Sequence, residues 1–263
     1  MMKQMTLKLA GLSVLLLSAS PVLADEAIIN NMSGSQTNTV QIAQYGGEFN
    51  ANFAEIYQDY SALSSHASIT QSGAGDQYAY VYQNGTGNDV SVMQAGAHGT
   101  ASIHEGSACY DSSATITQGE DSVNAHASIS QNHEYGYGYN NSASIDQDSV
   151  TGDQATISQI GGNDFAAITQ QYSYGPENAS TNQTGEGNLA IISQEIGSFD
   201  QTNIVQNGNG NQSTVQQFST YLCSASVEQN GNSNTAAIDQ LGDMKVATVI
   251  QWGSGNSTSI IQH

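Results

Sequence analysis

The sequence predicts an all-β protein, a β-solenoid of about ten stacked strand-turn-strand repeats of about 22 residues each. Three observations predict it. A short motif ending in Gln recurs about twenty times along the chain, its apolar residues alternate with polar ones, and the segments between motifs are rich in Gly and Asn. Apolar residues at the three- and four-residue spacing of a helix never persist, so no helix is expected.

The first 24 residues have the three parts of a secretory signal peptide. Two lysines precede an apolar run at residues 9–17, and this run is too short to cross a bilayer as a helix. Small and aliphatic residues then lead to Ala24, after which we expect cleavage. The sequence therefore predicts a signal peptide over residues 1–24 and a solenoid of about 20 strands over residues 25–263.

The mature chain is strongly acidic. Cleavage leaves Lys245 as one basic residue against 23 carboxylates, a formal charge of about −22, and the chain contains no Arg. Because nucleic-acid binding depends on Lys and Arg contacts to phosphates, we exclude a nucleic-acid partner. Binding to an anionic membrane surface is disfavoured for the same reason, and no membrane insertion is expected.

The repeated motif reads Ala, any residue, Ile or Val, any residue, Gln, as in HASITQ ending at Gln71 and QATISQ ending at Gln159. Asn31, Glu105 and Thr181 are exceptions to the pattern. Successive side chains of a β-strand point to opposite faces, so Ala, Ile and the final Gln share one face. Asn or Asp often stands on this face six residues before the Gln, whereas intervening residues such as Ser68 face water.

Gly-Asn turns separate the strands, for example at residues 84–88, 184–188, 207–211, 230–234 and 252–256. Gly and Asn tolerate positive φ, so each turn can reverse the chain within a few residues. One strand-turn-strand rung cannot cover its own Ile and Ala, but stacking rungs buries them in a continuous column.

Stacking also explains the inward amides, because identical Gln side chains in register can donate to one neighbour and accept from the other. We therefore predict a structural amide ladder. Its predicted members are Gln44, Gln58, Gln71, Gln83, Gln94, Gln118, Gln131, Gln147, Gln159, Gln170, Gln183, Gln194, Gln206, Gln217, Gln229, Gln240, Gln251 and Gln262, with Asn88, Asn188, Asn211, Asn234 and Asn256.

The spacing Gln-x4-Asn-x5-Gln, as in Gln83, Asn88 and Gln94, resembles the repeat of the curlin family, and the resemblance covers residues 27–262. It implies a curli-type fimbrial subunit, which forms a cross-β homopolymer outside a Gram-negative cell for adhesion and biofilm matrix. It also implies two partners, a nucleating minor subunit and an outer-membrane secretion pore. The last repeat, residues 246–263, lacks Lys and Arg, which favours the major subunit.

No catalytic, cofactor-binding or metal site is predicted, and we expect the protein not to be an enzyme. Glu105 replaces a ladder Gln, and we interpret it as a local defect that shares a proton or hydrogen bond with its neighbours. Solvated charge is favoured over calcium binding for the turn carboxylates Asp76, Glu186 and Asp243. Solvent-facing side chains are favoured over zinc ligands for His66, His98, His104, His126, His133 and His263.

Several readings stay open at this point. The segment at residues 132–141 is either an adhesive loop that exposes Tyr135, Tyr137 and Tyr139 or a tolerated insertion. Cys109 is expected in the turn of the fourth rung and Cys223 between the eighth and ninth, too far apart to form a disulfide within one molecule. The alternative function is a secreted monomeric solenoid that acts as an adhesin or an ice-binding protein.

Overall fold

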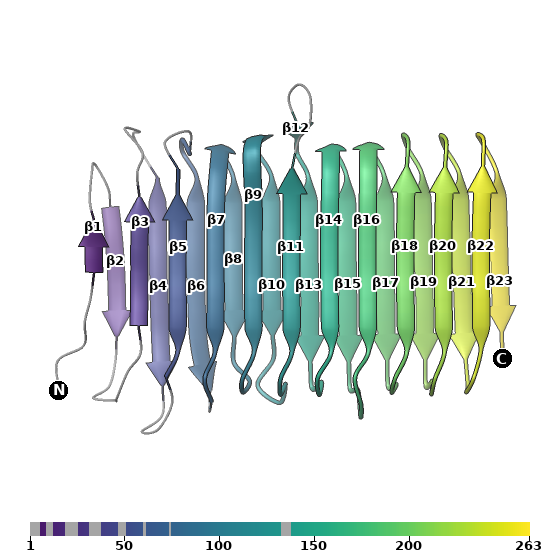
Figure 1. Cartoon of the computed structure of the whole chain (residues 1–263), viewed down its shortest axis with the longest axis horizontal. Coiled ribbons are helices and arrows are strands. Elements are labelled where there is room, and N and C mark those ends of the chain that lie inside the picture. The colour runs from purple at the N-terminus through teal and green to yellow at the C-terminus, as the bar shows by residue number, and fades with distance from the viewer. Residues whose placement is uncertain are drawn as a thin grey trace.

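The protein consists of two long β-sheets that face each other, and their strands run in opposite directions (Figure 1). The chain passes alternately between the sheets, so each rung contains one strand of each. The part of the chain that the structure describes contains no helix, and hence none that could span a membrane. The computed structural model describes residues 6–8, 13–18, 26–31, 38–46, 51–59, 62–73, 75–132 and 138–263.

Every pairing between neighbouring strands is parallel. Sheet A contains β1 (Thr6–Lys8), β3 (Glu26–Asn31), β5 (Phe53–Gln58), β7 (Tyr78–Thr86), β9 (Thr100–Tyr110), β11 (His126–Asn132), β14 (Gln154–Gly162), β16 (Asn178–Glu186), β18 (Gln201–Asn207), β20 (Ser224–Asn230) and β22 (Val246–Trp252), with β12 (Gly138–Tyr139) beside β9. Sheet B contains β2 (Ser13–Ser18), β4 (Thr39–Gly46), β6 (His66–Gly73), β8 (Asp89–Gln94), β10 (Ser113–Gln118), β13 (Ser142–Asp148), β15 (Phe165–Gln171), β17 (Leu189–Glu195), β19 (Gln212–Phe218), β21 (Thr235–Leu241) and β23 (Ser257–Gln262).

The predicted all-β solenoid is confirmed. From β3 to β23 the described residues form ten rungs, and nine stacking steps lead from the first to the last. The register places the final residues of the repeated motif opposite one another, for example Gln159 opposite Gln183 in sheet A and Gln170 opposite Gln194 in sheet B. A shift of one residue would turn every inward side chain outward, so the apolar pattern holds this register.

The core is a narrow layer between the two sheets. The Ile or Val of each motif and the Ala two residues before it form continuous columns, in which Ile157 and Ile168 are at most 1 % exposed. Burying each Ile contributes roughly 1.5–3 kcal/mol. Because most of the other inward side chains are polar, chiefly amides, the fold depends on hydrogen bonding inside this layer as well as on apolar contact.

Glycine permits the close stacking of the turns. Gly185 has a φ of 128°, and a Cβ placed on it would lie 2.1 Å from the carbonyl oxygen of Gly208. Gly208 has a φ of 117° and meets Gly231 in the same way. Other residues rarely adopt this conformation and would collide with the next rung, so the spacing of the turns requires glycine here.

Strands also occur in the segment that we expect to be the signal peptide. β1 pairs with β3, and β2 pairs with β4, in register with Val14 opposite Val40. The edge of a sheet presents unpaired backbone N–H and C=O groups, to which any adjacent extended segment can add. Cleavage after Ala24 stays a prediction, and it would leave β3 and β4 as the first strands of the solenoid.

Candidate functional site

The glutamine column of sheet B is continuous along the solenoid. Each side chain donates from Nε2 to Oε1 of the glutamine in the next rung, at distances of 2.8 to 3.0 Å. All donate toward the C-terminal end, so the column has a direction. Its members are Gln44, Gln71, Gln94, Gln118, Gln147, Gln170, Gln194, Gln217, Gln240 and Gln262.

The column of sheet A has the same direction but is interrupted. Hydrogen bonds from Nε2 to Oε1 of the next glutamine, 2.8 to 3.0 Å long, are continuous from Gln131 to Gln251, through Gln159, Gln183, Gln206 and Gln229. Closer to the N-terminus, Gln58 donates to Gln83 at 2.8 Å, and Gln83 donates to Glu105 at 3.4 Å.

A second N–H of the glutamine amides joins the two sheets. Gln183 Nε2 donates to the backbone carbonyl of Phe165 at 3.0 Å, and Gln206 Nε2 donates to that of Leu189 at 2.9 Å. Each of these side chains therefore uses both amide hydrogens and its oxygen. A buried polar group without a partner costs about 1–3 kcal/mol, so these ladders avoid a large penalty.

Glu105 interrupts the sheet A column, because the Oε1 of Gln131 in the next strand receives no hydrogen bond, and an ionised carboxylate would have no hydrogen to donate. The side chain of Glu105 is fully buried, and its Oε1 has no hydrogen-bond donor. Burial raises the pKa of Glu105 well above its usual value, Asp89 adds to the shift, and the hydrogen bond from Gln83 opposes it. A neutral carboxylic acid here could donate to Gln131.

Asparagines form a second type of ladder at the corner before the sheet B strands. The Oδ1 of Asn188 accepts from both the backbone N and Nδ2 of Asn211, at 3.1 and 3.2 Å, and Asn211, Asn234 and Asn256 repeat this contact. Between the asparagines, Nδ2 donates toward the N-terminal end, opposite to the glutamines. The same Nδ2 also donates to a backbone carbonyl of the next turn, as Asn188 does to Gly208 at 2.8 Å. Asn88 lies apart from them, and its Oδ1 accepts from the backbone N of Ser112 at 3.1 Å.

The opposite corner contains buried carboxyls that the predicted ladder did not include. Asp153, Glu177 and Asp200 occupy equivalent places before β14, β16 and β18, and all three are fully buried. Each stands six residues before a motif Gln, as the asparagines do, so the same spacing could have identified Glu177 and Asp200 from the sequence.

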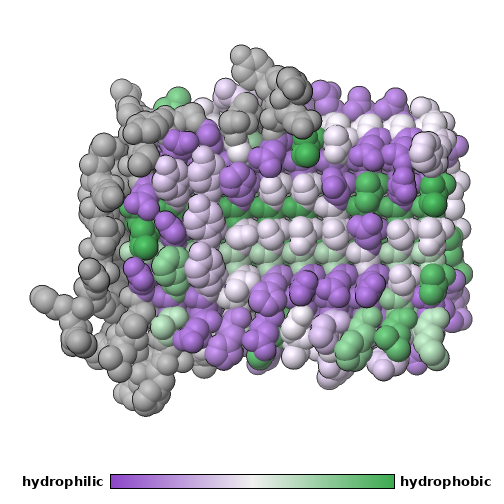
Figure 2. Space-filling view, viewed as in Figure 1, coloured by the Kyte–Doolittle hydropathy of each residue, from purple (hydrophilic) through white to green (hydrophobic). Residues whose placement is uncertain are grey.

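Among the described residues, no strand pairs with the outer side of β22 or β23, which form one edge of the solenoid (Figure 1). Ile260 of β23 is partly exposed, whereas Ile238, its partner in β21, is 1 % exposed. The outward face of β22 is also apolar, because Val246, Ile250 and Trp252 are 67 %, 59 % and 73 % exposed. Figure 2 shows apolar surface at this end of the molecule. Exposed apolar patches of this kind are typical of interaction sites.

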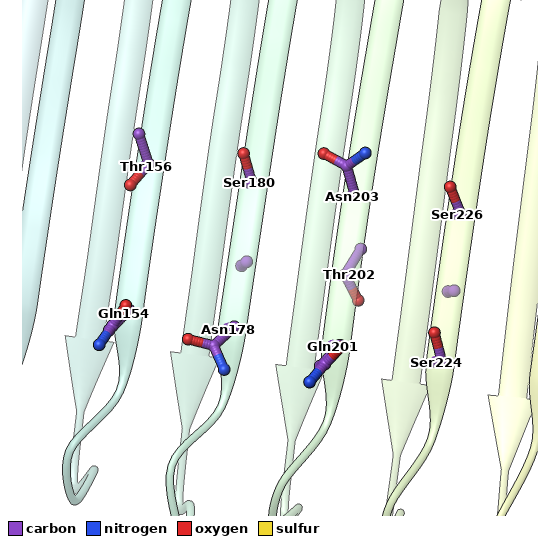
Figure 3. A pocket seen from close by; sticks show the side chains of 11 residues that line it. Gln154, Thr156, Asn178, Ser180, Gln201, Thr202, Asn203, Ser224 and Ser226 are labelled. Atoms are coloured by element: carbon purple, nitrogen blue, oxygen red, sulfur yellow. The ribbon is translucent and has the colours of Figure 1, made fainter.

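A shallow groove crosses the outer face of sheet A (Figure 3). The side chains of Gln154, Thr156, Asn178, Ser180 and Asn203 are among those that line it, and the residues that line it include no ionisable side chain. It offers hydrogen-bonding groups but no acid or base for proton transfer.

The histidines and turn carboxylates do not converge. Among the described residues, no group of three or more His, Cys, Asp or Glu side chains could hold a metal ion. Asp76, Glu186 and Asp243 are all exposed, and Glu186 is the last residue of β16. His104 stacks on Tyr82 with ring centroids 4.6 Å apart, and burial lowers its pKa.

The tyrosine-rich segment is described only in part. Residues 133–137, which include Tyr135, Tyr137 and His133, lie outside the described residues. Tyr139 is 43 % exposed on β12 and packs against Tyr110 of β9, with ring centroids 5.5 Å apart.

Both cysteines are buried and free. The expectation that Cys109 lies in a turn is wrong, because β9 continues past Glu105 and includes Cys109 opposite Gly85 of β7. Cys223 lies at the corner before β20, five strands further along sheet A. Five steps of about 4.8 Å far exceed the roughly 7 Å limit between the Cα atoms of a disulfide.

We therefore expect mass mapping under non-reducing conditions to find no intramolecular disulfide between Cys109 and Cys223. A sample refolded in reductant provides the control. Detection of this bridge in the monomer would contradict the register of sheet A.

Comparison with known families identifies the repeat. The family model described as the curlin associated repeat matches residues 64–96, which contain β6, β7 and β8. This chain contains a curlin associated repeat. The same register continues on both sides of the matched segment, so the other rungs share its geometry. No curated protein matches the sequence.

Proposed function

We propose that this protein is a structural subunit of an extracellular curli-type fibre and polymerises into a cross-β fibre for adhesion and biofilm matrix. In this proposal the protein is not an enzyme, and it is the major subunit. It crosses the outer membrane of a Gram-negative cell through a secretion pore, and a minor curlin subunit nucleates its assembly at the cell surface.

The open edge at β22 and β23 carries this proposal. Soluble solenoids normally cover their terminal rungs, because an exposed strand edge is a template for another chain. Here β23 keeps the inward pattern of the rungs before it, with Ile260 and Gln262 in register with Ile238 and Gln240. A second copy can continue both sheets from this edge. The exposed apolar side chains of β22 would then be partly covered.

The test is fibre diffraction from residues 25–263 after dilution from denaturant. We expect fibres with a meridional reflection at about 4.7–4.8 Å, the spacing between strands along a cross-β fibre. A protein that stays monomeric and soluble would contradict the fibre and favour a monomeric adhesin or ice-binding protein. Thermal hysteresis measurements on that monomer would separate these two alternatives.

Acid should accelerate the assembly. The mature chains carry a formal charge of about −22 and repel one another, and carboxylates lose their charge as the pH falls toward their usual pKa values. We expect a shorter lag in dye-monitored fibre growth at pH 4.5 than at pH 7, with ionic strength matched. A longer lag in acid would contradict this prediction.

A further inference from the structure

Three acidic side chains stack inside the solenoid at one corner. Asp153, Glu177 and Asp200 come immediately before β14, β16 and β18, and the register of these strands places them in consecutive rungs. All three are 0 % exposed. We name them the acidic column. Isolated buried carboxylates are unfavourable, so the contacts of each oxygen decide the charge state.

The first and last members of the acidic column accept hydrogen bonds. The Oδ1 of Asp153 accepts from the backbone N of Glu177 at 3.0 Å. The Oδ1 of Asp200 accepts from the backbone N of Cys223 at 2.7 Å, and its Oδ2 accepts from Thr220 Oγ1 at 2.5 Å. An aspartate at this corner therefore binds the backbone of the next rung, as the asparagines do at the other corner.

Glu177 makes no such contact. Neither of its carboxyl oxygens has a hydrogen-bond donor, and Oδ2 of Asp153 has none either. The longer side chain carries its carboxyl past the backbone N–H of the next rung and toward Asp200. A Cβ placed on Gly197 would lie 2.2 Å from Glu177 Oε1 and 2.4 Å from Asp200 Oδ2, so both oxygens adjoin the same small space.

The charges around the acidic column are also negative or neutral. Asp243 and the thiol of Cys223 lie near Asp200, and neither supplies a positive charge. Burial and then the charge of Asp243 raise the pKa of Asp200, and burial and then the charges of Asp200 and Asp243 raise the pKa of Cys223. Lys245, the only lysine after residue 24, donates its Nζ to the backbone carbonyl of His263 at 3.0 Å. Among the described residues, no group of three or more His, Cys, Asp or Glu side chains could hold a metal ion.

We propose that Glu177 is a neutral carboxylic acid in the folded solenoid, so that folding of this corner takes up one proton from solvent. The bound proton gives the acidic column its missing donor, an O–H on Glu177 beside Oδ2 of Asp200. It also leaves two negative charges in the column instead of three, separated by a neutral group. This inference concerns the folded rungs and does not depend on fibre formation.

The electrostatics agree with this geometry. Burial, followed by the charges of Asp153 and Asp200, raises the pKa of Glu177 to about 9, and burial raises that of Asp153 to about 6. An unfolded Glu has a pKa of about 4.3. Because the pKa of Glu177 is higher in the folded state, proton uptake by Glu177 stabilises the fold. This stabilisation is complete below about pH 4.3 and decreases as the pH rises toward about 9.

The test compares Glu177→Gln with the wild-type chain over residues 25–263. The amide has the shape of the neutral acid but takes up no proton. One proton bound on folding changes the equilibrium constant by about tenfold per pH unit. The measured quantity is the concentration of protein that stays soluble in equilibrium with fibres. Between about pH 5.5 and pH 8, the ratio of this concentration for wild type to that for Glu177→Gln should rise about tenfold for each pH unit. If the chain stays monomeric, guanidinium unfolding provides the same comparison.

Glu120→Gln is the matched control, because Glu120 is exposed in a turn. It should keep the wild-type pH dependence. Infrared spectra at pH 7 provide a second readout, in which the carbonyl band of a neutral carboxylic acid should be weaker in Glu177→Gln than in the control. Equal pH slopes for wild type and Glu177→Gln, or an unchanged infrared band, would overturn the proposal.

Discussion

Replacing Glu105 with glutamine is expected to stabilise the assembled solenoid by about 3 kcal/mol at pH 7 and by almost nothing at pH 4. The amide restores a donor to the column of sheet A. Gln131 Oε1 then accepts a hydrogen bond, as the equivalent oxygens do in the rungs that follow. Each buried acceptor that gains a donor removes a cost of about 1–3 kcal/mol.

The dependence on pH follows from the raised pKa of Glu105. Below its unfolded pKa of about 4.3, Glu105 is protonated in both states and can donate like an amide. As the pH rises, the wild-type chain must either keep the proton at a growing cost or bury a charge. The advantage of Glu105→Gln therefore grows with pH.

Guanidinium dissolution of fibres at pH 4, 6 and 8 measures this difference. At pH 7 the residual soluble concentration should fall about a hundredfold for Glu105→Gln, since about 1.4 kcal/mol corresponds to tenfold. Glu120→Gln, in an exposed turn, should leave it unchanged. A stabilisation of equal size at every pH would show that the carboxyl of Glu105 does not titrate.

A proline at Ser259 is expected to slow growth from the C-terminal edge by about tenfold or more. In a parallel strand, alternate residues direct their N–H and C=O groups to the same neighbour. Thr235 of β21 donates its backbone N–H to Asn256, toward the last rung, and Ser257 is its partner in β23. Ser259 has the same orientation, so its N–H points away from β21 and toward an incoming molecule.

Proline at this position removes a donor from the edge and leaves the hydrogen bonds between β21 and β23 intact. Two-colour imaging of wild-type seeds should show one growing end that stops after the first Ser259→Pro molecule, while circular dichroism retains the β-sheet signal. Ser259→Ala keeps the N–H and should grow normally. Equal growth of the two variants would indicate that fibres form by lateral association.

The sequence was sufficient to predict the repeat, and the register of the strands follows from the repeat. Period two identifies the strands, and the Gln at the end of each motif aligns them, so Gln159 and Gln183 could be paired without coordinates. The signal is strong because one-residue slips are penalised in every rung at once. The predicted glutamine columns and the Asn188 to Asn256 ladder lie on these registers.

Features outside the strict repeat could not be predicted. Cys109 lies in a strand because β9 runs on beside Gly85 and Gly138, and this depends on neighbours in other rungs. The isolation of Asn88 depends on Ser112, which stands in the next rung where an Asn would continue the ladder. The state of Glu177 depends on one methylene group, which changes what its carboxyl can reach.

The shared direction of the glutamine columns makes the two ends of the solenoid chemically different. Gln262 Nε2 uses one N–H on the carbonyl of Val246, and its other N–H can meet an acceptor such as Gln44 Oε1 in a following copy. Two copies joined through the same end would instead oppose donor to donor. The contact is thus heterologous and cannot close into a two-fold dimer. Each added copy exposes a new edge like the one that it covers, so assembly continues as a polar filament.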